Sequence, residues 1–277
     1  MQATAELTLG YIPYLNCVPF FARLKDNGFQ GTFVAGVPSA LNAMLQEGSL
    51  DASPSSSFEY ACNWRNYLLL PGHAIASVGP VKSVLLFSPT DPSELAGQKI
   101  YITGESATSI NLLRIIFREF YGLHDVTDAV PDEAIEVLIE RQKPALLIGD
   151  RALRLANNLP DGMQIFDLGE LWHQQTGLPF VFALWMIRRE VVGRYHDEFV
   201  KLGAQLSLSR EQVMSQPHRF AGGVAESSGL TVDQISDYWQ TIDYRLETEH
   251  LEGLQLFFRL CKKYHLLEEE PELNFFI

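Results

Sequence analysis

The residue with the clearest chemical potential in this sequence is Asn16, an uncharged amide in the loop Gly10-Tyr-Ile-Pro-Tyr-Leu-Asn16-Cys-Val-Pro19. A short apolar run over residues 7–12 predicts a strand that leads into this loop. A buried amide needs most of its donors and acceptors satisfied, so Asn16 either stabilises a turn or contacts a ligand. An amide can orient and polarise a substrate, but it is a poor base.

Hydroxyl groups gather in two further segments. Ser55, Ser56 and Ser57 follow a predicted strand and offer several donors to a carboxylate, although such serine clusters also form turns. The segment Thr103-Gly-Glu-Ser106-Ala-Thr108-Ser109 precedes a periodic helix over 106–121, and free N–H groups at a helix start bind carboxylates or phosphates. An N-cap role for Ser106 is compatible with that site. The segment lacks the GK[ST] ending of a nucleotide P-loop, which excludes nucleotide binding there.

Two more segments are expected at the same site. The apolar run Leu146-Leu-Ile-Gly149-Asp150 ends in a glycine that lets a ligand approach the backbone closely. Asp150 is either a catalytic carboxylate or the cap of a helix that begins at Arg151, and the sequence favours the cap. The loop-forming segment over 172–180, which ends in Pro179 and Phe180, supplies a further expected wall.

The alternation of strand and helix patterns predicts an α/β fold in two lobes with a ligand cleft between them. Pro89-Thr-Asp-Pro92 interrupts the pattern and is the expected crossing to the second lobe. An apolar strand over 181–187 is expected to lead the chain back, and the pattern is helical from about residue 196. The predicted division is 1–88 plus 188–277 for the first lobe and 89–187 for the second.

Composition and charge exclude several classes of protein. The chain has 277 residues, is 47% hydrophobic and carries a net charge of −13, which argues for a globular protein and against nucleic acid or an anionic membrane as partner. No apolar run approaches the length of a membrane span, and residues 1–6 do not read as a signal peptide. An anionic ligand would therefore need a locally positive pocket built from backbone N–H groups and helix starts.

The cysteines and the missing motifs narrow the chemistry. Cys17, Cys62 and Cys261 are odd in number and widely spaced, so we expect a reducing, cytoplasmic location with neither disulfides nor a metal site. The sequence contains no G-x-S-x-G, no H-E-x-x-H and no glycine-rich dinucleotide fingerprint. Any reaction would have to be one that positioned hydrogen bonds promote.

Several motifs in order along the chain resemble the MqnA family, the chorismate dehydratases of the futalosine route to menaquinone. They are Gly10-Tyr-Ile-x-Tyr-Leu-Asn16-x-x-Pro19, Ser55-Ser56, Gly79-x-Val81-x-Ser83-Val84, Ser106-x-Thr108-Ser109, Ile148-Gly149-Asp150, Asp167-Leu168-Gly169 with Trp172, Thr176-Gly177-Leu178-Pro179-Phe180 and Asp243-Tyr244-Arg245-Leu246. The resemblance implies a type II periplasmic-binding-protein-like fold used as a cytoplasmic enzyme. It also implies the loss of water from chorismate to give 3-[(1-carboxyvinyl)oxy]benzoate, with no cofactor. The substrate-binding positions that it implies are Tyr14, Ser55, Ser56, Ser83, Ser106, Thr108, Ser109, Gly149, Asp150, Pro179 and Phe180.

The proton acceptor has two candidates under this resemblance. Our hypothesis is that a carboxylate of the substrate takes the proton while Asn16 holds the substrate and assists departure of the hydroxyl. Asp150 as general base is the competing assignment. A non-catalytic solute-binding protein for a small carboxylate is the alternative function, because this fold is mostly used in that way, and a ligand-sensing regulatory domain is a third possibility. The sequence leaves the oligomeric state open.

Overall fold

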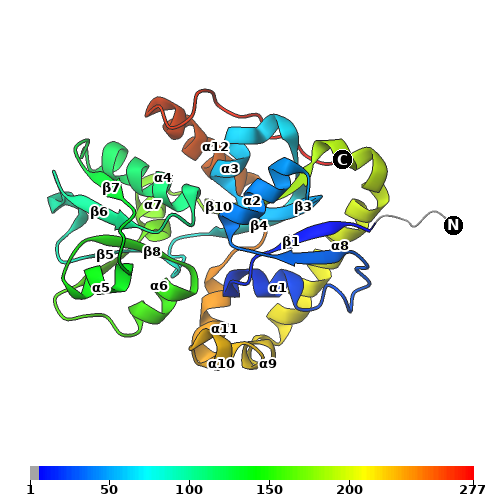
Figure 1. The fold of residues 1–277 in the computed structure, drawn as a ribbon, viewed down its shortest axis with the longest axis horizontal. Coiled ribbons are helices and arrows are strands. Elements are labelled where there is room, and N and C mark those ends of the chain that lie inside the picture. Colours follow the sequence, from blue (N-terminus) through cyan, green and yellow to red (C-terminus); the bar gives the residue numbers. More distant parts are fainter. Residues whose placement is uncertain (1–5) are drawn as a thin grey trace.

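The computed structural model describes residues 6–277 and contains two five-stranded mixed sheets with helices packed around them (Figure 1). Residues 1–5, part of the segment in which no signal peptide is expected, lie outside the described residues. The α/β class predicted from the sequence is confirmed. No helix over 6–277 is both long enough and apolar enough to cross a bilayer.

The first sheet has the strand order β2-β1-β3-β10-β4 and forms the core of the first lobe. Its strands are β1 (Thr8–Tyr11), β2 (Thr32–Ala35), β3 (Ala52–Ser56), β4 (Tyr67–Ser77) and β10 (Phe180–Arg188). β1 pairs in parallel with β2 and β3, whereas β10 runs antiparallel between β3 and β4. β10 therefore returns the chain from the second lobe into the middle of the first sheet.

The second sheet has the order β7-β6-β8-β5-β9 and forms the core of the second lobe, drawn mostly in green in Figure 1. Its strands are β5 (Val84–Ser88), β6 (Lys99–Ile102), β7 (Thr127–Ala129), β8 (Ala145–Ile148) and β9 (Gln164–Asp167). β5 is buried along its whole length because its two faces serve different cores. Leu86 joins the large core that extends through both lobes, while Leu85 and Phe87 join a smaller core that includes Ile135 and Ala152.

The helices lie mainly where the sequence predicts them, but the helix after β8 begins at Gly149 with Ile148 as its N-cap, so Asp150 lies in its first turn and is not the cap that the sequence favours. They are α1 (Val18–Phe21), α2 (Pro38–Glu47), α3 (Ser57–Asn63), α4 (Ala107–Ile115), α5 (Ile135–Glu140), α6 (Gly149–Ala156), α7 (Leu168–Thr176), α8 (Val192–Ser215), α9 (Pro217–Gly222), α10 (Ala225–Ser228), α11 (Val232–Thr241) and α12 (Thr248–Lys263). Thr231 and Gln234 form a capping box at the start of α11. Gly48 ends α2 in the left-handed conformation with a φ of 88°.

The crossings between the lobes differ from the sequence-based boundaries at 88 and 187. β5 belongs to the second sheet, so the outward crossing is the segment 78–83, and β10 belongs to the first sheet, so the return crossing is 177–179. Pro92 instead lies in a 3₁₀ turn that Asp91 caps inside the second lobe. We therefore propose that the second lobe consists of 84–176 and the first lobe of 6–77 plus 180–277.

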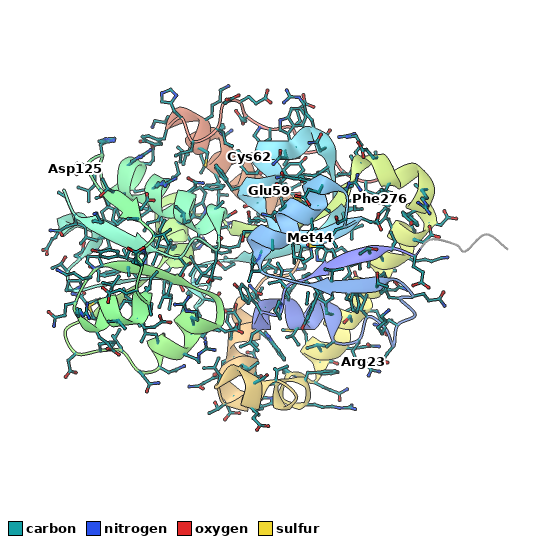
Figure 2. All side chains as sticks on the ribbon, viewed as in Figure 1. Arg23, Met44, Glu59, Cys62, Asp125 and Phe276 are labelled. Carbon is teal, nitrogen blue, oxygen red and sulfur yellow. The ribbon has the colours of Figure 1, made fainter. Side chains whose placement is uncertain are left out.

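The cysteines do not form a bridge. Cys17 and Cys261 are buried free thiols, and Cys62 is an exposed free thiol on α3 (Figure 2). All three residues lie within the described part of the chain.

The return crossing depends on one close approach between α12 and the segment before β10. A Cβ atom at Gly253 would collide with the carbonyl oxygen of Pro179, which is backbone and cannot turn away. We expect Gly253→Ala to lower the free energy of unfolding by about 1–3 kcal/mol, measured by urea denaturation. The matched control is Gly193→Ala, because a Cβ at Gly193 meets no described atom within 4 Å. Equal stability of the two variants would contradict the proposed contact.

Candidate active site

A cavity lies where the two lobes meet, and most of the predicted polar residues line it. Its empty volume, which includes the open space at its mouth, is about 600 Å³. The predicted residues in its wall are Tyr14, Asn16, Ser56, Ser83, Ser106, Ser109 and Gly149. A larger open hollow elsewhere is lined by Arg210, Asp243 and Arg245, but none of the predicted site residues reaches it.

Asn16 lies in a single 3₁₀ turn, Leu15–Cys17, that neighbouring elements hold from two sides. The backbone N–H of Leu15 donates to Asp150 Oδ1 at 3.2 Å, and Trp239 Nε1 donates to the carbonyl of Leu15 at 2.7 Å. The buried Oδ1 of Asn16 has no hydrogen-bond partner among residues 6–277. A buried amide oxygen without a partner is costly, so this atom is a candidate acceptor for a hydrogen bond from a ligand.

Four helices begin at the cavity wall. Ser56 caps α3 by accepting from Glu59 N–H at 3.3 Å, and Ser106 caps α4 by accepting from Ser109 N–H at 3.3 Å. Pro38 is the first residue of α2, and Gly149, with a φ of 64°, is the first residue of α6. The positive ends of the four helix dipoles therefore point toward one space.

The wall combines these helix starts with uncharged side chains. None of the described residues that line the cavity is an aspartate, glutamate, lysine, arginine or histidine. Backbone N–H groups and hydroxyls thus supply the positive potential that an anionic ligand needs in a chain with a net charge of −13. This is the arrangement expected from the sequence for a carboxylate ligand.

The two titratable groups in the wall are unsuited to act as bases. Burial, followed by the charge of nearby Glu105, raises the pKa of Tyr14, whose phenol donates to Glu105 at 3.4 Å. Burial, followed by the charge of Asp150, raises the pKa of the Cys17 thiol. Both groups therefore keep their protons at neutral pH.

Thr108 and Asp150 lie behind the wall, where they join the two lobes. Thr108 Oγ1 accepts from the backbone N–H of Phe58 at 2.9 Å, and Asp150 accepts from Leu15 as described above. Burial raises the pKa of Asp150, and the N–H of Leu15 partly offsets that shift. Neither residue lines the cavity, so the structure places both as contacts between lobes rather than in the cavity wall.

Ser55, Pro179 and Phe180, which are predicted substrate contacts, do not line the cavity either. Ser55 is fully buried in β3, and its hydroxyl has no partner in the described range. The carbonyl of Pro179 accepts from Trp172 Nε1, and the ring of Phe180 packs against Trp172 with centroids 5.2 Å apart. These three residues build the core next to the site.

The apolar part of the cavity wall was not predicted from the sequence. Phe182 reaches the cavity because the pairing of β10 with β4 shifts between Val181 and Ala183, so that Phe182 is the additional residue of a β-bulge. The other lining residues without an assigned role are Ile12, Cys17, Pro38, Ile75, Val81, Val84, Ile148 and Ala183. Several of them belong to the same short motifs as Asn16, Ser83 and Gly149. Their position next to these predicted residues was the only feature of the sequence that could have identified them.

Asp167 is a further residue that has no role predicted from the sequence, and it lies outside the cavity wall. Its carboxylate accepts from Val81 N–H at 3.1 Å and Lys82 N–H at 2.6 Å in the outward crossing. It also accepts from Gly169 N–H at 2.9 Å and Glu170 N–H at 3.2 Å at the start of α7. Asp167 therefore fixes the segment that leads into Ser83.

Solved structures with the same architecture establish the fold. A crystal structure of a protein from Archaeoglobus fulgidus superposes with a TM-score of 0.75 at 18% identity, over 96% of this chain and 100% of the other. The periplasmic aliphatic sulphonate binding protein SsuA from Escherichia coli gives a TM-score of 0.72 at 15% identity, over 97% of this chain and 90% of that one. The predicted periplasmic-binding-protein-like fold is confirmed.

Sequence comparison identifies the family. Two relatives carry the name chorismate dehydratase. The one from Thermus thermophilus is 30% identical over 90% of this chain and 93% of its own length, and the one from Campylobacter jejuni is 26% identical over 94% and 100%. A family model described as menaquinone biosynthesis matches residues 7–263. The chain therefore belongs to the menaquinone biosynthesis family, in agreement with the resemblance of its motifs.

Proposed function

We propose that this protein is a chorismate dehydratase that converts chorismate to 3-[(1-carboxyvinyl)oxy]benzoate and water for menaquinone biosynthesis. The observation that carries the proposal is a cavity lined by hydroxyls, one amide with a free acceptor and four helix starts, with no charged side chain among its described lining residues. Such a wall suits a dicarboxylate. The names of the Thermus thermophilus and Campylobacter jejuni relatives support the same activity.

The proposed reaction needs little chemical help from the protein. One ring carbon loses a proton, and the electron pair of that C–H bond becomes part of the ring π system. The neighbouring carbon releases its hydroxyl with the C–O electron pair, and this hydroxide takes up the proton that the ring carbon lost, which gives water. Because the ring becomes aromatic, the substrate supplies the driving force, and we propose that no cofactor takes part. The enzyme orients the bonds and holds the enolpyruvyl arm away from competing rearrangements.

We further propose that a carboxylate of the substrate accepts the ring proton. The raised pKa values of Tyr14 and Cys17 and the engagement of Asp150 with Leu15 N–H support this assignment over a protein base. Asn16 then holds the departing hydroxyl, and Ser56, Ser83, Ser106 and Ser109 donate to the carboxylates together with the helix starts. Free thiols at all three cysteines support a cytoplasmic setting for the enzyme.

Ultraviolet absorbance separates catalysis from binding. Incubation of the purified protein with chorismate should replace the diene absorbance with that of an aromatic product whose mass is lower by one water. A stable complex with unaltered chorismate would contradict the enzyme and favour a solute-binding protein, the usual role of this fold.

We expect Asn16→Ala to lower kcat by a factor of about 10²–10³, the usual effect of removing one hydrogen-bond donor, here the amide Nδ2, aimed at charge that develops in the reaction. Steady-state kinetics and a chorismate dissociation constant measured by fluorescence would separate turnover from affinity. The control is Asn157→Ala, since Asn157 is exposed and does not line the cavity. Near-normal turnover and unchanged affinity in Asn16→Ala would exclude the proposed role.

Asp150→Asn tests the competing base. The variant keeps an oxygen that can accept from Leu15 N–H, so we expect kcat to remain within about tenfold of the native value. Asp150→Ala, which removes that acceptor, should lose more activity through displacement of the Asn16 turn. A loss of about 10²–10⁴ in Asp150→Asn, the usual contribution of a general base, would instead identify Asp150 as the proton acceptor.

A further inference from the structure

We infer that Tyr238 is a positioning residue that holds the Ser83 hydroxyl with its proton directed at the substrate. The inference rests on the function proposed above, because it assumes that the ligand of the cavity is chorismate. Tyr238 lies on α11, far along the chain from Ser83 and outside the cavity wall.

The backbone of Ser83 is already fixed from both sides. Val81 and Lys82 donate to Asp167, and the carbonyl of Ser83 accepts from Gly149 N–H at 2.7 Å. Ser83 is 2% exposed, so its side chain has little room outside the cavity. The remaining freedom is the rotation of the hydroxyl group itself.

Tyr238 removes that freedom. Its phenol donates to Ser83 Oγ at 2.8 Å, and burial keeps the phenol protonated. A phenol is a stronger donor and a weaker acceptor than an aliphatic alcohol, so the donor in this pair is Tyr238. With one lone pair of Oγ occupied, the hydroxyl proton of Ser83 is left to point away from Tyr238, toward the cavity that Ser83 lines.

Trp239, the residue after Tyr238, connects α11 to the turn that carries Asn16. Trp239 Nε1 donates to the carbonyl of Leu15, which lies directly before Asn16. Tyr238 and Trp239 are both almost fully buried, at 1% and 0% exposed. One helix outside the cavity thus aligns two of its polar residues, Ser83 through its side chain and Asn16 through its backbone.

Tyr238→Phe removes the hydroxyl and keeps the ring. We expect kcat for chorismate to fall about tenfold while the chorismate dissociation constant changes much less, because the oriented donor acts on the charge that develops during the reaction. The matched control is Tyr60→Phe. Tyr60 is fully buried, and its hydroxyl also makes hydrogen bonds, to the carbonyl of Glu272 and from the N–H of Asn274, each at 2.8 Å. It should lose comparable stability and keep native turnover.

A double-mutant cycle with Ser83→Ala then tests whether Tyr238 acts through Ser83. We expect Tyr238→Phe to have no further effect on kcat in the Ser83→Ala background. An equal loss in both backgrounds, or equal kinetic effects of Tyr238→Phe and Tyr60→Phe, would assign Tyr238 a merely structural role and overturn the inference.

Measurements on the native protein separate failure of the positioning role of Tyr238 from failure of the proposed function. Native turnover without coupling between Tyr238 and Ser83 overturns the positioning role alone. Binding of chorismate without turnover overturns the dehydratase activity. The same double-mutant cycle is then read in the chorismate dissociation constant: coupling between Tyr238→Phe and Ser83→Ala keeps the positioning role, and no coupling overturns it. If native protein does not bind chorismate, both proposals are wrong.

Discussion

The geometry of the cavity depends on four hydrogen bonds that the carboxylate of Asp167 accepts. Asp167 is the last residue of β9, and the donors are two backbone N–H groups of the crossing segment and two of the first turn of α7. Hydrogen bonds to a charged acceptor are stronger than neutral ones, and these four partly offset the burial that raises the pKa of the Asp167 carboxyl. The crossing segment is therefore attached to the second sheet, and Ser83 enters the wall at a fixed place. The carbonyl of Ser83 accepts a hydrogen bond from the N–H of Gly149, so the start of α6 is fixed relative to the crossing segment as well.

The polar half of the site could be predicted because it follows local rules. A serine before a periodic helix caps it wherever the helix packs, so the N-cap role of Ser106 was predicted from sequence, whereas Ser56 was predicted only as part of a hydroxyl cluster. The apolar half depends on pairing between distant strands. Phe182 enters the cavity through a bulge against β4, and strict alternation along β10 does not reveal a bulge. The lobe boundary proposed above differs from the sequence-based one for a related reason, since a proline such as Pro92 interrupts the pattern both at a crossing and at a turn within a lobe.

The residues behind the cavity wall contact the opposite lobe, whereas the residues in the wall face the cavity. Thr108 and Asp150 accept N–H groups from the opposite lobe, so they bear on how the lobes meet. Asn16, Ser83, Ser106 and Ser109 face the space between the lobes. A motif that contains both kinds, such as Ser106-x-Thr108-Ser109, therefore places a contact between the lobes and two residues of the cavity wall within four positions.

The positive ends of α2, α3, α4 and α6 at one cavity have a consequence for how such a protein can diverge. A field that comes from backbone amides survives the replacement of every side chain around it, provided the helices still begin at the same places. Under the proposed function, the contribution of the helix starts to anion binding then depends on the topology, and mutation can change the shape of the cleft and the side chains that line it. Sequence identity in this architecture can fall to 15–18%, as in the structural relatives, while the fold that carries the field persists. A scaffold of this kind can acquire a reaction by altering a few hydroxyls and one amide, without first having to evolve a new anion-binding site.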